Sequence, residues 1–135
     1  MAKTVARLLV ESLEAHDVDR LYCVPGESYV GLTSVLVERN SMQLVVCRHE
    51  SGAAFMAVAD GRLRSRAGVA MVSRGPGLAN AMVALHSAHH DCTPMVLLVG
   101  HVERRDVGRQ ALQEQNYSVL LSDVTKTVIE VIDPD

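Results

Sequence analysis

Residues 44–77 read LVVCRHESGAAFMAVADGRLRSRAGVAMVSRGPG, and this stretch decides the fold. It contains two short apolar runs, at 44–47 and 69–72, each of a length that suits one strand. Between them, residues 50–64 carry small apolar side chains at helical spacing. A strand, a helix and a second strand joined by short connections form a right-handed crossover between parallel strands. The stretch therefore predicts a parallel sheet.

The same alternation extends over the whole chain. Further apolar runs occupy 21–24, 95–99 and 128–132, and helical spacing occurs at 4–16, 28–39 and 77–90. Continuous apolar runs are typical of strands that are buried on both faces. We therefore predict one α/β domain over residues 1–135, with an open, doubly wound, mostly parallel sheet and helices on both faces, as in flavodoxin-like folds. Residues 101–116 are polar and weakly periodic, which indicates a long loop of the kind that often carries function.

Composition excludes several classes of protein. Hydrophobic residues make up 48% of the chain but aromatic residues only 3%, so the core is expected to be aliphatic. The net charge is −3 and no basic stripe occurs, which disfavours a nucleic-acid partner. The three cysteines form no C-x-x-C pair, which favours free thiols in a reducing, cytoplasmic compartment. The run at 95–99 is too short to span a membrane, and no signal peptide is evident.

Glycine-rich and polar clusters follow each of the first four apolar runs. They are Pro25-Gly26-Glu27-Ser28, Arg48-His49-Glu50-Ser51-Gly52, Ser73-Arg74-Gly75-Pro76-Gly77 with Asn80, and Gly100-His101. Ligands of an open parallel sheet bind beyond the carboxyl ends of its strands. The four clusters therefore predict a binding site at this edge of the sheet.

Glu50 permits two interpretations from the residues alone. It is either a first-turn acid favoured by the helix dipole or a carboxyl group that relays a proton. The motif from Gly75 to Asn80 matches the dinucleotide fingerprint only in part, because Asn80 replaces the third glycine and no acid ends the next strand. His86 and His90 share a helix face, but H-E-x-x-H is absent, so we predict no metal site in this chain.

Ordered motifs over nearly the whole chain resemble those of a known family. They are Val24-Pro25-Gly26-Glu27-Ser28, Cys47-Arg48-His49-Glu50-Ser51-Gly52-Ala53-Ala54-Phe55-Met56-Ala57, Ala59-Asp60-Gly61-Arg62-Leu63, Ser73-Arg74-Gly75-Pro76-Gly77, Asn80, Asp91-Cys92-Thr93-Pro94-Met95, Gly100 and Gln113-Glu114. The chain resembles the N-terminal, pyrimidine-binding (PYR) domain of thiamine diphosphate enzymes, most of all the large subunits of acetolactate synthase. The resemblance implies part of a transferase or lyase that decarboxylates or joins 2-keto acids.

The resemblance also implies roles for individual residues on the cofactor side. Glu50 matches the glutamate that hydrogen-bonds N1' of the aminopyrimidine ring and favours the imino tautomer that takes the C2 proton of the thiazolium. The turn beside the thiazolium corresponds to Pro25, Gly26 and Glu27. The loop and helix start near the pyrimidine correspond to Gly75, Gly77 and Asn80.

On the substrate side, Gln113 matches a glutamine that lines the substrate channel, and His101 is expected near it. Three positions there depart from the acetolactate synthase pattern. Glu27 stands where the biosynthetic enzymes have a second glycine, Leu112 where phenylalanine is usual, and His101 where glutamine is usual. The resemblance therefore supports the cofactor role more strongly than it supports acetolactate synthesis itself.

The family's Gly-Asp-Gly motif, which holds the diphosphate and Mg²⁺, does not occur in this sequence, nor does the central domain that binds FAD in some members. The resemblance implies that a diphosphate-binding domain of another subunit completes the site, within a homodimer or larger assembly, and that the chain alone is inactive. It is then either a domain of a longer enzyme or one subunit of a split 2-keto acid decarboxylase. A non-catalytic, flavodoxin-like nucleotide-binding module is the alternative outside this family.

Overall fold

A four-stranded, all-parallel sheet forms the centre of the molecule in the computed structural model, which describes residues 4–132. The strands are β1 (Arg20–Cys23), β2 (Gln43–Val46), β3 (Gly68–Val72) and β4 (Met95–Val99). They lie in the order β2-β1-β3-β4, and every neighbouring pair is parallel. The predicted α/β fold is confirmed.

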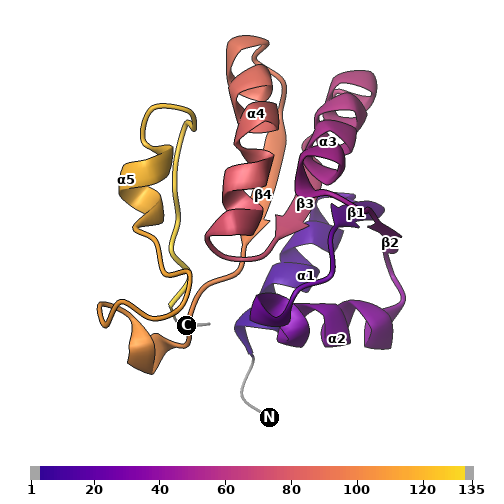
Figure 1. The fold of residues 1–135 in the computed structure, drawn as a ribbon. Coiled ribbons are helices and arrows are strands. Elements are labelled where there is room, and N and C mark those ends of the chain that lie inside the picture. The colour runs from indigo at the N-terminus through magenta and orange to yellow at the C-terminus, as the bar shows by residue number, and fades with distance from the viewer. Residues whose placement is uncertain (1–3, 133–135) are drawn as a thin grey trace.

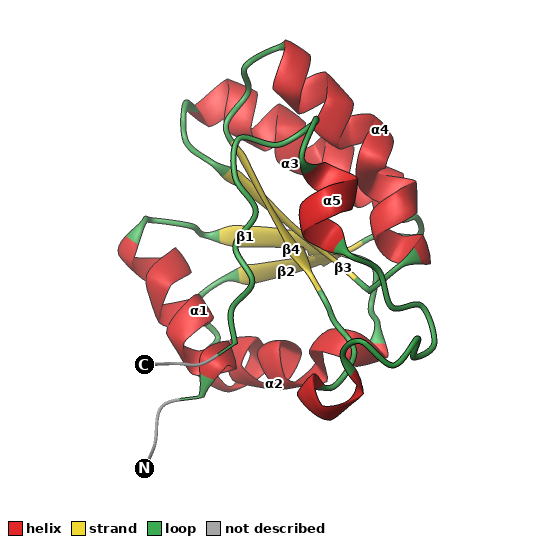
Figure 2. Cartoon of the chain, turned by 90° about the vertical axis from the view of Figure 1, so that its left-hand side faces the viewer, coloured by secondary structure: helices red, strands yellow, loops and turns green. Residues whose placement is uncertain are grey.

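Helices cover both faces of this sheet. The elements are α1 (Val5–Ala15), α2 (Val30–Arg39), α3 (Glu50–Arg64), α4 (Pro76–His90), α5 (Tyr117–Leu121) and two short 3-10 helices, η1 (Glu27–Tyr29) and η2 (Arg104–Asp106). The helices α1 and α2 lie on one face, and α3 and α4 lie on the other (Figure 2). The helix α5 lies beside α4, at the left of the view in Figure 1, and its Leu121 packs into the same cluster as α4.

Strand β3 supplies side chains to both layers of the core. Val69 and Met71 pack into the cluster beneath α1 and α2, whereas Ala70 and Val72 face α3 and α4. All five residues of β3 are buried, as expected for a central strand of a parallel sheet. The edge strands β2 and β4 are half-exposed, so the prediction of burial on both faces is wrong for them.

Small residues let α3 lie close to the sheet. Ala53, Ala54 and Ala57 are fully buried on its inner face. A Cβ atom placed on Gly68 of β3 would lie 1.8 Å from the carbonyl oxygen of Ala57, and one on Gly61 would lie 2.3 Å from that of Pro94. Glycine is therefore required at both positions, because a side chain would push the helix away from the strand.

Local signals set the ends of the helices. Thr4 caps α1 by accepting a hydrogen bond from the Arg7 amide, and His49 caps α3 by accepting one from the Ser51 amide. The helix α4 begins at Pro76, a residue favoured in the first turn. These ends agree with the predicted helices at 4–16, 50–64 and 77–90. The predicted helix at 28–39 begins as the 3-10 turn η1 and becomes α-helical at Val30.

The fifth predicted strand is absent from the described residues. Residues 128–132 run without strand pairing, and Ile129, Val131 and Ile132 are 77%, 42% and 56% exposed. The run has the composition of a strand, but it forms no hydrogen-bonded ladder with the edge of β4. The prediction of a strand here is therefore wrong. Among the described helices, none is long and apolar enough to cross a membrane.

Candidate functional site

The carboxyl edge of the sheet has a switch point between β1 and β3. The chain leaves β1 toward α2 on one face and leaves β3 toward α4 on the other face, so a crevice opens between the two strand ends. A Cβ atom placed on Gly26, after β1, would lie 3.0 Å from Cβ of Ser73, after β3. The segments that follow the two strands are therefore in contact across the switch point.

Glu50 lies at this edge, where α3 and α4 begin. It is the first residue of α3 and is half-buried. Its Oε2 accepts a hydrogen bond of 2.9 Å from Nδ2 of Asn80 in α4. A Cβ atom on Gly77 would lie 3.4 Å from Oε1 of Glu50 and 2.7 Å from Oγ of Ser73, so the absence of a side chain there keeps the second carboxylate oxygen uncrowded. The structure thus brings together Glu50, Gly77 and Asn80.

Tyr29 fixes the turn that follows β1. It is buried, and its hydroxyl group donates a hydrogen bond to the carbonyl oxygen of Val24, which closes the turn containing Pro25 and Gly26. Burial, and to a smaller extent the nearby Cys23 and Glu50, raises the pKa of the Tyr29 phenol, so it remains a neutral donor. Pro25 itself is exposed.

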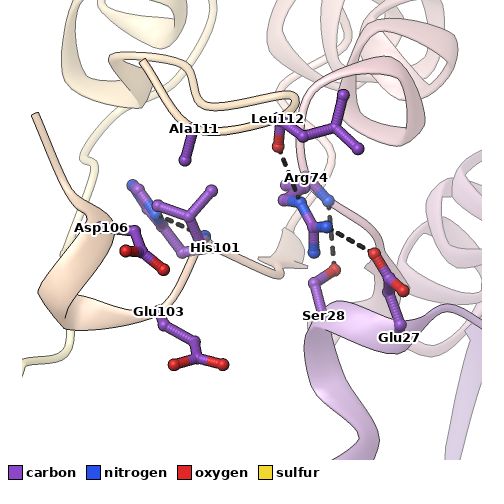
Figure 3. A pocket seen from close by; sticks show the side chains of 9 residues that line it. Glu27, Ser28, Arg74, His101, Glu103, Asp106, Ala111 and Leu112 are labelled. Atoms are coloured by element: carbon purple, nitrogen blue, oxygen red, sulfur yellow. Dashed lines mark hydrogen bonds and ion pairs between the residues drawn. The ribbon is translucent and has the colours of Figure 1, made fainter. Parts of the chain in front are cut away.

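A pocket of about 630 Å³ opens on the other side of the switch point (Figure 3). Its walls come from η1, the end of β3 and the loop after β4, and they include Glu27, Ser28, Arg74, His101 and Leu112. Arg74 lies between the two walls: its Nη2 donates to Oε1 of Glu27 at 2.5 Å and its Nε donates to the carbonyl oxygen of Leu112 at 3.1 Å. The predicted site residues Glu27 and His101 therefore share one pocket.

The loop at 101–116 is folded against the same edge. Gln113 has a positive φ of 65°, and its backbone packs on Gly75, where a Cβ atom would lie 2.7 Å from the Gln113 carbonyl oxygen. Gly75 itself has φ 52°, a conformation that favours glycine. The Tyr117 hydroxyl accepts from the Gly75 amide at 3.3 Å and donates to the Gly100 carbonyl oxygen at 3.2 Å.

Two of the loop's own side chains give it a defined shape. The Glu114 carboxylate accepts hydrogen bonds from the amides of Gly108, at 2.5 Å, and Ala111, at 3.0 Å. The bond from Gly108 is the main reason why the pKa of Glu114 is lowered. The Nδ1 atom of His101 accepts from the Val102 amide at 2.7 Å, and the His101 ring meets the Tyr117 ring edge-on.

Five of the predicted site residues form two groups, while Gly75 and Gln113 contact each other and Gly26 contacts Ser73. Glu50, Gly77 and Asn80 lie where α3 meets α4, whereas Glu27 and His101 line the pocket across the switch point. Sequence reasoning missed Arg74, Tyr29 and Tyr117 as residues that hold these segments together. For Arg74 a signal was available, because opposite charges follow the neighbouring strands β1 and β3.

Arg48 and the histidines of α4 lie outside this arrangement. Arg48 is exposed, and the hydrogen-bond partner of Glu50 is the amide of Asn80. The rings of His86 and His90 are stacked with centroids 6.5 Å apart on the exposed surface of α4. Within residues 4–132, no group of three or more His, Cys, Asp or Glu side chains is arranged to hold a metal ion.

Comparison with known proteins agrees with this geometry. The family model described as "Thiamine pyrophosphate enzyme, N-terminal TPP binding domain" matches residues 3–120. The catabolic acetolactate synthase of Raoultella terrigena is 36% identical over 130 residues, which is 96% of this chain and 23% of that protein. The acetolactate synthase of Bacillus subtilis (strain 168) is 34% identical over 128 residues, which is 95% of this chain and 22% of that protein.

A plant relative shows a similar extent of likeness. The chloroplastic acetolactate synthase of Arabidopsis thaliana is 32% identical over 128 residues, which is 95% of this chain and 19% of that protein. The chain thus spans about a fifth of the length of the curated relatives that it matches. Because the family model covers most of the chain and the fold is the expected one, the chain belongs to the family of N-terminal TPP binding domains of thiamine pyrophosphate enzymes.

Proposed function

We propose that this domain is the aminopyrimidine-binding half of a thiamine diphosphate active site of acetolactate synthase type, which acts on 2-keto acids by decarboxylation or carboligation. The observation that carries the proposal is the position of Glu50. Its carboxylate lies at the carboxyl edge of the sheet, and its hydrogen bond comes from the amide of Asn80 rather than from a cation. A half-buried carboxylate in this position is suited to hold a ring nitrogen and a proton.

The residues around Glu50 hold its carboxylate in a defined position. Gly77 is buried, and a Cβ atom there would lie 3.4 Å from Oε1 of Glu50 and 2.7 Å from Oγ of Ser73, so a side chain at this position would crowd the carboxylate. The hydrogen bond from Asn80 to Oε2 orients the carboxylate and leaves Oε1 as the oxygen that we propose for the aminopyrimidine. Thiamine diphosphate, when bound, supplies a carbon nucleophile and an electron sink for 2-keto acids. The part of this chain is to hold the aminopyrimidine and to exchange a proton with it through Glu50.

The pocket across the switch point is proposed as the substrate side of the site. Glu27 and Ser28, which follow the turn at Pro25 and Gly26, form one wall, and His101 with Ala111 and Leu112 of the following loop forms the other. Gly26 of the turn contacts Ser73, and Ser73 lies beside Gly77 next to Glu50, so the pocket and the carboxylate lie at the same edge of the sheet. The acceptor substrate is then selected by the pocket side chains.

A diphosphate-binding domain of another subunit is the proposed partner, and it would also bring the Mg²⁺ ion. The outer surfaces of α3 and α4 support this proposal, because Phe55, Met56, Leu63 and Val83 are 43%, 46%, 85% and 53% exposed. Exposed apolar side chains on two adjacent helices are typical of a surface that a partner covers. On this proposal the chain is one half of an enzyme and has no turnover by itself.

Calorimetric titration of thiamine diphosphate with Mg²⁺ tests this proposal. The chain should bind weakly or not at all when alone, and tightly once a diphosphate-binding domain of an acetolactate synthase-type enzyme is present. Thiamine without its diphosphate is the control, because the added domain should then give little gain in affinity. If the mixture of the two domains bound thiamine diphosphate no better than the diphosphate-binding domain alone, the proposal would be wrong.

A further inference from the structure

We propose that Arg74 is a positioning residue that ties together the two walls of the pocket, and thereby sets where Glu27 and Leu112 stand relative to the substrate. The structural part of this inference stands on the contacts of Arg74 alone. Its consequence for turnover rests on the function proposed above.

Arg74 lies at the point where three segments meet. It follows β3, its guanidinium group contacts the turn after β1 through Glu27, and it contacts the loop after β4 through Leu112. Its backbone amide also donates to Oγ of Ser28 at 3.3 Å. Its side chain is only 14% exposed although its partner Glu27 is 76% exposed, so the arginine fills the crevice and the glutamate lies at its rim (Figure 3).

The geometry of the guanidinium group explains why arginine occupies this position. Its Nε and Nη2 atoms donate in two directions from one rigid plane, and here each direction serves a different wall of the pocket. A lysine ammonium group is a single point charge on a flexible stem. It is able to pair with Glu27, but it has no fixed second donor for the Leu112 carbonyl group.

The loop depends on Arg74 for its attachment more than for its shape. Glu114 closes the loop on itself through the Gly108 and Ala111 amides, and this closure involves no atom of Arg74. The attachment to the sheet edge comes from Arg74, from Tyr117, which joins Gly75 to Gly100, and from the packing of Gln113 on Gly75. Leu112 is 75% exposed, so packing of its side chain contributes little to holding this part of the loop. Loss of the arginine should therefore weaken the attachment of residues 108–116 and make local opening of the loop more frequent.

Amide hydrogen exchange of the 135-residue chain tests the attachment directly. In Arg74→Gln we expect exchange in residues 108–116 to increase about tenfold, the effect of losing a hydrogen bond to a charged group on a local opening equilibrium. In Arg74→Lys, amide exchange in the turn at 25–29 should stay as slow as in the parent, because lysine is still able to pair with Glu27. Exchange in the loop should be as fast as in Arg74→Gln. Glu27→Gln should loosen the turn alone. Arg62→Gln is the control, because Arg62 pairs with Asp91 at the far ends of α3 and α4.

Kinetics of the enzyme completed by its diphosphate-binding domain tests the positioning role. With pyruvate as the probe, Arg74→Lys should raise KM about tenfold and change kcat less than about threefold, because a displaced loop weakens substrate binding. The affinity for thiamine diphosphate should stay the same. Equal loop exchange in Arg74→Gln and Arg62→Gln would overturn the attachment, and so would full protection of the loop by lysine.

An unchanged KM beside a loosened loop would overturn the role in substrate positioning. If the parent enzyme itself showed no turnover that depends on thiamine diphosphate, the proposed function would fail. The exchange result would still decide whether Arg74 holds the two walls together, so the two failures are distinguishable.

Discussion

Replacing Glu50 by glutamine separates the chemistry of this carboxylate from its contribution to the fold. Glu50 is the first residue of α3, where a negative charge stabilises the helix by about 0.3–1 kcal/mol. The glutamine carbonyl oxygen is still able to accept the hydrogen bond from Asn80, so only the difference between a charged and a neutral acceptor is lost, about 1 kcal/mol. The domain should therefore lose about 1–2 kcal/mol of stability, or about 3–10 °C in Tm.

Turnover should respond far more strongly than stability. A glutamine amide does not exchange protons as a carboxyl group does, and a positioned acid or base contributes about 10²–10⁴-fold to a rate. The assay is the rate of pyruvate consumption by the completed enzyme at saturating thiamine diphosphate and Mg²⁺, together with thermal unfolding of each variant. We expect a loss of at least about 100-fold in kcat for Glu50→Gln.

The control for this prediction is Glu38→Gln. Glu38 makes the same carboxylate-to-amide change in α2, where it forms an exposed ion pair with Arg7, so stability should change by less than about 1 kcal/mol. Its turnover should match that of the parent. A Glu50→Gln enzyme that is folded, saturated with cofactor and within about threefold of parental kcat would refute the role assigned to this carboxylate.

Three further predictions concern the fold and its surface. Gly68→Ala should destabilise the domain by about 1–3 kcal/mol or more in urea unfolding, because the new Cβ would lie 1.8 Å from the Ala57 carbonyl oxygen. Gly31→Ala, with nothing within 4 Å of its Cβ, should be neutral or stabilising, and equal midpoints would contradict this reasoning. Burial raises the pKa of the Cys23 thiol from 9.0 to about 11, so the folded state favours the neutral thiol, and the contribution of Cys23 to stability should be constant below pH 9 and decline as the pH rises toward 11. Cys23→Ala should show a shallower decline over this window, and an unchanged slope would argue against the assignment. The isolated chain should self-associate through α3 and α4, and Phe55→Ser with Leu63→Ser should shift it toward monomer in sedimentation velocity; a parent chain that is monomeric at high concentration would rule this out.

The elements that sequence predicted best are those whose signal is local. The bounds of α3 agree with the predicted range because the apolar spacing, the cap at His49 and the left-handed residue Ser65 all lie within or beside the helix. The run at 128–132 has an equally strong local pattern, yet it is not a strand. Strand formation requires a neighbour that offers paired backbone groups, and that neighbour is a property of the whole fold rather than of the run.

The predictions for the site divide in the same way, between local features that succeeded and long-range contacts that were missed. The placement of Glu50, Gly77 and Asn80 at one edge followed from the rule that ligands bind at the carboxyl ends of parallel strands. Arg74 bonds to Glu27, 47 residues away in the sequence, and to Leu112, 38 residues away. Hydrophobic periodicity within a segment does not predict contacts over such separations. The position of Gln113 likewise depends on a left-handed backbone conformation, which is not predicted for a glutamine.

The close packing of α3 on the sheet has a consequence for mutations far from the carboxyl edge of the sheet. Gly61 in α3 and Gly68 in β3 fix how closely the C-terminal part of α3 lies against the sheet. Glu50 is the first residue of the same helix, eleven residues before Gly61 and about 16 Å away along the helix axis. A methyl group added at either glycine would tilt or shift α3, and the carboxylate of Glu50 would move with the helix. If the proposed function is correct, a substitution at the amino end of β3 should therefore lower turnover without altering any atom that touches a ligand.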